Sequence, residues 1–273
     1  MLYVVATPIG NLGDITLRAL DVLRTVPVVA AEDTRLTRRL WARHGIETRL
    51  VSYHAHSEPR RRHELLAHLA DGQDLALVTD AGTPLVSDPG EELVSEWAAR
   101  GGRVVPIPGA SAVLAALVAS GLPSARWSFE GFLPRRGRER RDRLARICAD
   151  DRATVLFEAP GRAAATLGEL AEACGPGRPA ALCRELTKLH EEIWRGGLGE
   201  LAARASEAPP RGEVTIVVAC ADPAMPQTPS ATDLVAGRDE VLRLVGQGMS
   251  RSSAAREVAQ RTGLPRRALF DSR

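Results

Sequence analysis

The sequence predicts an α/β protein built from two consecutive α/β domains and a small helical C-terminal extension. Short apolar runs of strand length alternate with helical patterns through residues 1–120, which is typical of a largely parallel sheet. The alternation begins again after residues 121–126, a Gly- and Pro-containing connection. The length of 273 residues suits two modest domains, and 44% hydrophobic with 26% charged residues is a globular composition.

The first domain, residues 1–120, is expected to hold five strands and five helices. The strands are expected at residues 2–6, 28–31, 50–53, 75–79 and 104–107. The helices are expected at residues 17–24, 36–44, 59–70, 91–100 and 112–119. This order predicts a sheet with helices between successive strands.

The second domain, residues 121–222, repeats the pattern with four expected strands. These lie at residues 129–133, 154–157, 180–184 and 214–219, with helices at 140–148, 163–173 and 198–206. A stretch rich in Pro, Ser, Thr and Ala at residues 223–232 predicts a linker. The extension, residues 233–273, is expected to form helices at 239–246 and 252–262.

Charge and cysteine content indicate the cellular compartment of the protein more clearly than they indicate its binding partner. The net charge of +2 does not by itself indicate nucleic acid, although every basic residue except Lys188 is an arginine. The four cysteines, Cys148, Cys174, Cys183 and Cys220, show no C-x-x-C spacing, so we expect four reduced thiols and no zinc site. Neither a signal peptide nor a membrane-spanning stretch is evident, which predicts a cytoplasmic protein.

Three loops rich in Gly, Pro and small polar residues follow expected strands, at residues 6–14, 79–90 and 106–112. Open α/β sheets bind ligands at the carboxyl ends of their strands, where small residues let the backbone approach a ligand. Each loop alone could be a tight turn, but three together favour a binding site. The fingerprint G-x-G-x-x-G and the P-loop are both absent, so a nicotinamide or Walker-type nucleotide is not indicated.

In this order, the loops resemble those of the tetrapyrrole-methylase fold. Further stretches resemble one branch of it, the 16S ribosomal RNA (cytidine-2′-O)-methyltransferases: residues 31–35 (AEDTR), 54–58 (HAHSE), 131–134 (GFLP), 184–188 (RELTK) and 212–213 (GE). The chain departs from that branch in two places. Ser57 stands where Asn is usual, and residues 159–162 read Ala-Pro-Gly-Arg instead of Ser-Pro-His-Arg.

The resemblance implies S-adenosylmethionine in the cleft between the two domains, without a metal. It also implies a homodimer, and a cytidine of 16S ribosomal RNA, free or in the small ribosomal subunit, as the substrate. By position in the motifs, the cofactor-binding residues would be Pro8, Ala81, Gly82, Thr83, Val86, Ser111, Ala112, Phe157 and Glu158.

The catalytic candidates are Glu32, Arg35 and Lys188. Glu32 and Arg35 follow the second expected strand and should share the sheet edge with the cofactor loops. Asp33 is at least as well explained as the cap of the following helix. Lys188 stands where a compact charge is needed or where one lysine survived by chance. His54 and His56 share a face if their segment is extended, and could position RNA or form a polar network.

Two arginine clusters are expected to contact RNA phosphates, which position RNA without reading its sequence. They comprise Arg60, Arg61 and Arg62, and, beside the expected cleft, Arg135, Arg136, Arg138, Arg140, Arg141 and Arg143. The alternative for such a run is a solvated helix face. The arginines of the C-terminal helices favour an accessory role in RNA docking or dimer support.

Three other functions fit parts of this pattern. A tetrapyrrole (precorrin-type) methylase would share the cofactor loops but should lack residues 31–35, the arginine run and the helical extension. A non-catalytic RNA-binding protein would keep the fold without binding the methyl donor. A protein methylase of the diphthine type would transfer the methyl group to protein.

Overall fold

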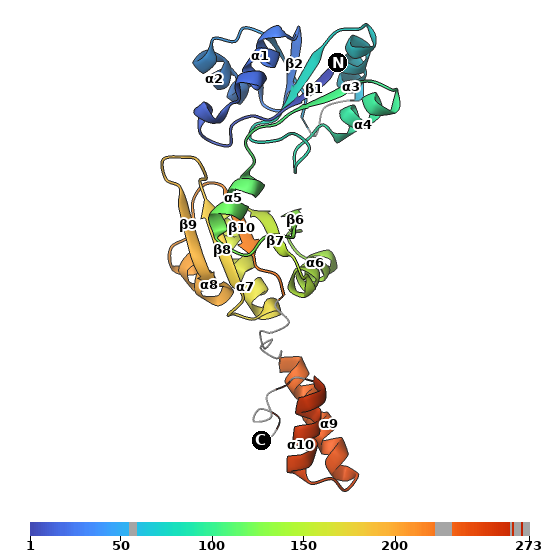
Figure 1. Cartoon of the computed structure of the whole chain (residues 1–273), viewed down its shortest axis with the longest axis vertical. Helices are drawn as coiled ribbons and strands as arrows, with labels where there is room; N and C mark the ends of the chain where they lie inside the picture. The colour runs from blue at the N-terminus through green and yellow to red at the C-terminus, as the bar shows by residue number, and fades with distance from the viewer. Residues whose placement is uncertain (55–58, 222–230, 263, 265–268, 270–273) are drawn as a thin grey trace.

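The computed structural model describes residues 1–54, 59–221, 231–262, 264 and 269. Two five-stranded sheets follow one another along the chain, and a pair of helices ends it (Figure 1). This confirms the predicted α/β class with a helical extension. None of the helices within the described residues is long and apolar enough to cross a membrane.

The first sheet is entirely parallel, with the strand order β3-β2-β4-β1-β5. Its strands are β1 (Leu2–Val5), β2 (Val28–Ala31), β3 (Arg49–Ser52), β4 (Leu75–Val78) and β5 (Val104–Ile107). All five were expected, two of them with the bounds that the structure shows and three with ends that differ by one residue. Because the strands are parallel, the loops that follow β1, β2, β4 and β5 meet at one edge of the sheet.

Helices cover both faces of this sheet, because successive strand residues point to opposite sides. Figure 1 shows α1 (Leu17–Thr25) and α2 (Thr34–His44) on one side, and α3 (Pro59–Ala70) and α4 (Glu91–Ala99) on the other. Leu23 and Trp41 pack with one set of strand residues, whereas Leu66 and Leu93 pack with the alternate set. A short 3₁₀ helix, η1 (Leu12–Asp14), interrupts the loop after β1.

The second sheet is mixed, with the order β6-β7-β10-β8-β9; β6 and β7 are parallel and the remaining pairs are antiparallel. Its strands are β6 (Trp127–Phe132), β7 (Ala153–Glu158), β8 (Pro179–Arg184), β9 (Glu192–Gly197) and β10 (Val214–Val218). Strand β9 was not expected, because its sequence EIWRGG holds two adjacent apolar residues and ends in two glycines. It lies at the sheet edge and buries Trp194.

The helices of this second lobe are α6 (Arg138–Ala149), η2 (Pro160–Arg162), α7 (Ala163–Cys174) and α8 (Leu198–Glu207). They bury one face of the sheet in a core that includes Leu156, Leu167 and Leu201.

The other face of the second sheet is covered by α5 (Ala112–Ser120), with Ala116 and Leu117 against Val155 and Val217. The expected bounds of the first domain, residues 1–120, include this helix. It lies instead against the second sheet (Figure 1), so the chain passes between the lobes just after β5. The helix sequence does not show which sheet it packs against, because its own residues are apolar on all sides of the helix.

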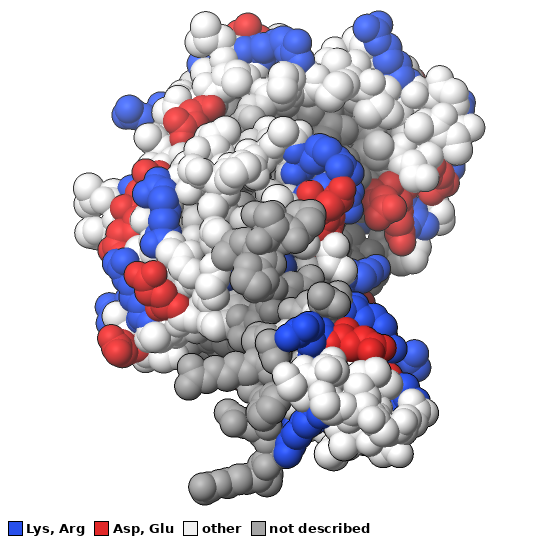
Figure 2. Space-filling model, turned by 60° about the horizontal axis from the view of Figure 1, so that its bottom comes forward, with Lys and Arg blue, Asp and Glu red and all other residues white. Residues whose placement is uncertain are grey.

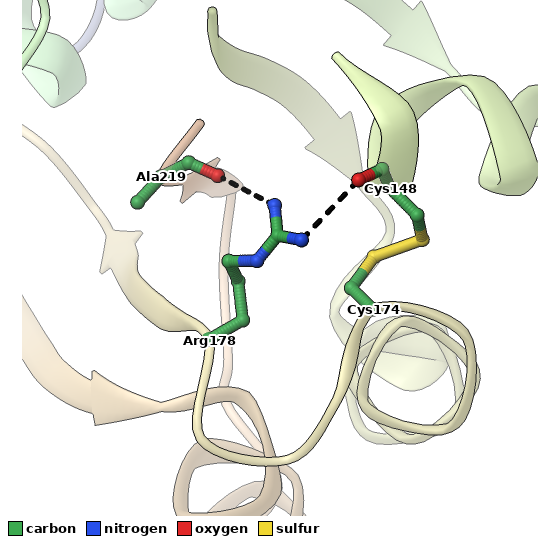
Figure 3. Close-up of a disulfide and its surroundings, with 4 residues drawn as sticks. All are labelled: Cys148, Cys174, Arg178 and Ala219. Carbon is green, nitrogen blue, oxygen red and sulfur yellow. Dashed lines mark hydrogen bonds between the residues drawn. A yellow bond between two sulfur atoms is a disulfide. The ribbon is translucent and has the colours of Figure 1, made fainter. Parts of the chain in front are cut away.

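Two of the four cysteines form a disulfide, which corrects the expectation of four reduced thiols. Cys148 in α6 and Cys174 in α7 are bonded, with their Cα atoms 4.8 Å apart, because the two helices pack together. Figure 3 shows the Arg178 guanidinium beside them, donating to the carbonyl oxygens of Cys148 and Ala219. Cys183 and Cys220 are free. Burial raises the pKa of the Cys183 thiol to about 11, so it is a poor nucleophile.

The C-terminal helices α9 (Ala231–Gly246) and α10 (Arg251–Thr262) pack as a pair. Val241, Ala254 and Val258 form its core. Glu240 of α9 accepts hydrogen bonds from Arg243 and, across the pair, from Arg261 at 2.6 Å. These bonds lower the pKa of Glu240 to about 2. Both helices were expected, although α9 begins eight residues earlier than the expected start at residue 239.

Candidate active site

A cavity of about 400 Å³ opens where the carboxyl edge of the first sheet meets the second lobe. Of the nine residues expected to bind the cofactor, eight line it: Ala81, Gly82, Thr83, Val86, Ser111, Ala112, Phe157 and Glu158. Pro8 does not, although its neighbour Ile9 does. The structure thus gathers residues from three separate loops and from β7 around one space.

Backbone hydrogen bonds tie the first two loops together at the cavity. Thr7 and Gly82 form an antiparallel bridge, with N–H···O distances of 2.8 and 3.1 Å. The Thr7 hydroxyl also donates to the carbonyl oxygen of Thr79. Gly82 needs its conformational freedom here because its φ is +86°, which side chains disfavour.

The third loop is fixed by the start of α5. Ser111 caps this helix, its hydroxyl accepting from the N–H of Leu114 at 3.5 Å. The Thr83 hydroxyl donates to the carbonyl oxygen of Ala110, also at 3.5 Å, and so links the second loop to the third. The cavity walls are therefore connected to one another before any ligand arrives.

Strand β7 forms the second-lobe wall. The Phe157 ring lines the cavity and packs against Phe132, with ring centroids 5.6 Å apart. Glu158 also lines the cavity, but its side chain is buried. Its carboxylate accepts a hydrogen bond from the Thr166 hydroxyl at 2.6 Å and pairs with Arg162. The cofactor-binding role of Glu158 stays a prediction: the residue lines the cavity, while its carboxylate is hydrogen-bonded inside the second lobe.

Lys188 bridges two carboxylates and touches the opposite lobe. Its Nζ donates to Glu185 at 2.8 Å and to Glu213 at 3.1 Å. Its aliphatic stem lies so close to Gly10 that a Cβ there would collide with it. Nearby, the Thr187 hydroxyl accepts from the N–H of Asn11, at 3.2 Å. Lys188 thus holds the first loop against the second lobe.

The loop after β2 brings acidic residues to the same edge. Glu32 accepts a 2.7 Å hydrogen bond from the Thr79 hydroxyl. Asp33 caps α2, as the alternative interpretation expected, and binds the Arg35 guanidinium, which lowers the pKa of Asp33 to about 2. The Arg35 side chain is 84% exposed, outside the cavity. Asp80 accepts from the Asp33 N–H.

Asp88 is the acidic residue that the sequence did not single out. It lines the 400 Å³ cavity and also a second cavity of about 230 Å³, formed with Tyr53, His54 and Arg62 among others. Burial and, to a smaller extent, the neighbouring Glu32 carboxylate raise the pKa of Asp88 to about 6. A carboxyl whose pKa lies near neutrality can act as an acid or a base.

Three of the expected RNA-binding arginines are used inside the protein. The side chain of Arg140 is 7% exposed and donates to Glu169, the Pro134 carbonyl and Thr166. That of Arg143 is 22% exposed and donates to Glu130. That of Arg62 is 23% exposed and pairs with Glu92 and Glu96. A phosphate role for these three stays a prediction, and their guanidinium groups are already paired with carboxylates of the protein.

The remaining expected arginines lie at the surface. Arg60 and Arg61 pair with Glu64, and Arg138 pairs with Asp142. Arg135, Arg136 and Arg141 are exposed, on the chain that leaves the cavity after Phe132. On the face shown in Figure 2, basic and acidic side chains alternate and no continuous basic surface forms.

The segment with the two expected histidines is only partly described by the structure. His54 is exposed and lines the second cavity. His56 and Ser57 lie outside the described residues. Among the residues that are described, no cluster of three or more His, Cys, Asp or Glu side chains could hold a metal ion.

Comparison with known proteins gives two family matches. The family described as Tetrapyrrole (Corrin/Porphyrin) Methylases matches residues 1–202, and the RsmI C-terminal HTH domain matches residues 233–271. The chain is 47% identical to "Ribosomal RNA small subunit methyltransferase I" of Synechocystis sp., over 99% of this chain and 96% of that protein. It is 39% identical to the protein of that name from Bacillus subtilis, over 100% and 93%.

Solved structures show the same fold at lower identity. A uroporphyrin-III C-methyltransferase from Thermus thermophilus, complexed with S-adenosyl homocysteine, matches with a TM-score of 0.58 and 21% identity, over 80% of this chain and 96% of that one. A diphthine synthase matches with a TM-score of 0.63 and 19% identity, over 80% and 89%. With these matches, the chain belongs to the tetrapyrrole (corrin/porphyrin) methylase family, together with the ribosomal RNA small subunit methyltransferases I.

Proposed function

We propose that this protein transfers a methyl group from S-adenosylmethionine to the ribose 2′-hydroxyl of a cytidine in 16S ribosomal RNA. The observation that carries the proposal is the cavity between the lobes, in which three loops and β7 meet. The names of full-length relatives at 39–47% identity support ribosomal RNA of the small subunit as the substrate.

The cavity fits the methyl donor in size and chemistry. Its volume of about 400 Å³ is within the range of small-molecule sites. Ile9, Val86 and Phe157 offer apolar surface to the adenosine part, and Asp88 offers negative charge to a cationic sulfonium. When bound, S-adenosylmethionine supplies an electrophilic methyl group.

The protein's own contribution is mainly orientation, which can lower a barrier by roughly 7–11 kcal/mol in favourable cases. The connected loops would hold the donor in a fixed pose. Lys188 would keep the lobes at a constant separation through Gly10, and Glu32 would hold Thr79 and Asp80 at the acceptor side. Arg35, which is exposed, and the surface arginines Arg60, Arg61, Arg135, Arg136, Arg138 and Arg141 would contact RNA phosphates.

Transfer of labelled methyl from S-adenosylmethionine tests the proposal. The wild-type protein is incubated with 16S ribosomal RNA and, separately, with small ribosomal subunits, and the digested RNA is examined for 2′-O-methylcytidine. A Thr83→Trp variant, which should fill the cavity, serves as the inactive control. Label in protein or in a tetrapyrrole, or no binding of S-adenosylmethionine by calorimetry, would overturn the proposal.

The proposal extends to a homodimer acting in the cytoplasm, where ribosomal RNA is found. Leu114 and Val118 of α5 are exposed apolar side chains, which suits an interface between copies. Sedimentation equilibrium tests the dimer directly, and a monomer at micromolar concentration would remove this part of the proposal.

A further inference from the structure

We propose that the Phe132 ring stacks on the nucleobase of the acceptor cytidine and so holds its ribose at the mouth of the donor cavity. The inference rests on the proposed function and names a residue that positions the substrate of that reaction. Phe132 is a large apolar residue at the end of β6, yet it is 53% exposed and lines the 400 Å³ cavity. Exposed aromatic rings are the surfaces on which proteins stack unpaired bases.

A bulge in β6 turns the Phe132 ring toward the cavity. Phe129 of β6 stands opposite Val155 of β7. Phe132, three residues later, stands opposite Phe157, so β6 has one residue more than β7 in this interval. In a regular strand, residues three apart point to opposite faces, and Phe132 would then face the core under α6 and α7. The extra residue instead puts both rings on the face of Phe157, and bulges re-aim side chains in this way beside functional sites.

The same bulge brings β6 against the first lobe. Gly131 has a φ of +60°, which favours glycine, and a Cβ there would lie 3.1 Å from the Ser87 hydroxyl oxygen. Ser87 belongs to the loop after β4 and also lines the cavity. Phe132 thus comes directly after the residue at which the second lobe meets the first. Because its ring is half exposed, it lies at the rim of the cavity, where a substrate larger than the donor must approach.

Three guanidinium groups hold the backbone that carries the Phe132 ring. The carbonyl oxygens of residues 132, 133 and 134 accept hydrogen bonds from Arg143, Arg162 and Arg140, at 3.2, 3.0 and 2.9 Å. These bonds fix the segment that leaves β6 before any ligand arrives. A side chain on a fixed backbone loses little conformational freedom when a ligand packs on it. The inward arginines of the α6 run therefore support the site by holding the ring in place.

The exposed half of the ring suits the base of the acceptor nucleoside. Phe132 meets Phe157 at an interplanar angle of 55°, with the ring centroids 5.6 Å apart, and this tilted contact covers only part of the ring. The ribose is bonded directly to its base, so a base stacked at the rim brings the 2′-hydroxyl to the donor cavity. Arg135 and Arg136 follow in the chain and are exposed, where flanking phosphates can reach them. Every base has an aromatic face, so Phe132 positions the nucleoside without selecting cytidine.

Replacing the ring tests the stack. Phe132→Leu keeps an apolar side chain without an aromatic face, whereas Phe132→Tyr keeps the ring. Because Phe132 lines the donor cavity, both variants are expected to bind S-adenosylhomocysteine more weakly, so RNA binding is measured with each protein saturated by it. Phe132→Leu should then bind a single-stranded RNA spanning the methylated cytidine about tenfold more weakly than wild type, and Phe132→Tyr within about twofold of it. Trp127→Leu is the matched control and should bind like wild type, since Trp127 is exposed at the opposite end of β6. A ring that served the donor alone would leave RNA affinity unchanged in saturated Phe132→Leu, which would refute the proposal.

An RNA that lacks one base separates stacking from a structural effect of the substitution. In this second RNA, the methylated cytidine is replaced by an abasic ribose that keeps its 2′-hydroxyl. Wild type should prefer the complete RNA about tenfold, and Phe132→Leu less than about twofold, because the variant has no ring for the base to cover. The same preference in both proteins, whether tenfold or none, would refute the stack. If wild type methylates no RNA, the proposed function fails, whereas active wild type with equal RNA affinity of saturated Phe132→Leu removes only this inference.

Discussion

Arg140 and Arg141 are neighbours in one helix, yet the structure predicts opposite consequences when each is replaced by alanine. Arg140 is inside the second lobe, where its guanidinium donates to Glu169 at 2.6 Å, to the Pro134 carbonyl at 2.9 Å and to Thr166 at 2.9 Å. Arg141 is exposed. If the arginine run binds RNA, only its surface members can contribute to that binding.

The cost of Arg140→Ala follows from what the side chain leaves behind. The Glu169 side chain is 43% exposed, so water can solvate its carboxylate. The Pro134 carbonyl and Thr166 oxygen lose a donor near the core, and a buried group left unsatisfied costs about 1–3 kcal/mol. We therefore expect Arg140→Ala to lower the free energy of unfolding by about 3 kcal/mol. Arg141→Ala should change it by less than about 0.5 kcal/mol.

Urea unfolding and RNA binding at several salt concentrations measure both effects. Arg141→Ala should reduce the slope of log affinity against log salt by about 0.7, the value for one lost contact to a single strand. Arg140→Ala, measured where it is folded, should keep the wild-type slope. The reasoning would be refuted if Arg140→Ala were as stable as wild type, or if it changed the salt slope while Arg141→Ala did not.

Three further predictions concern the cavity, the disulfide and pH. Gly82→Val should abolish binding of S-adenosylmethionine in calorimetry, because the φ of Gly82 is +86° and the new side chain meets Ile9. An unchanged affinity would show that the donor binds elsewhere. Cys148→Ser should lower the unfolding free energy by about 3 kcal/mol, as a loop of 26 residues is released, and dithiothreitol should reproduce the loss in wild type. Folding raises the pKa of Asp88 from 3.8 to about 6, so the folded state binds more protons in that interval and stability falls as pH rises through it. Asp88→Asn should therefore match wild type below pH 3.8 and exceed it above pH 6 by about 1 kcal/mol in urea melts, a figure reduced for screening of a half-exposed group.

The first sheet could be predicted from sequence because each of its strands is a short apolar run between helical patterns. Val28–Ala31 and Val104–Ile107 were expected with the bounds that the structure shows. The loops that line the 400 Å³ cavity could also be located, because parallel strands place their following loops at one edge. The packing of α5 could not, since its apolar surface extends around the whole helix and fits either sheet.

The direction of each side chain in the arginine run could not be predicted from the sequence. Adjacent helix residues point about 100° apart, so a run of arginines must send some toward the neighbouring helix. Arg140 reaches Thr166 and Glu169 of α7, which lie far along the chain. No local pattern in residues 135–143 shows that these partners exist. The identity of the inward arginine thus depends on how α6 and α7 pack.

Asp88 was missed for a related reason. Glu32 was chosen as a candidate because it directly follows a strand, and the structure shows its carboxylate already accepting from Thr79. Asp88 comes ten residues after β4 ends and returns to the same place only because Leu85 and Ser87 adopt left-handed conformations. Sequence signals such conformations mainly through Gly and Asn. A carboxylate brought to the cavity by two non-glycine residues at positive φ can be found only from the folded loop.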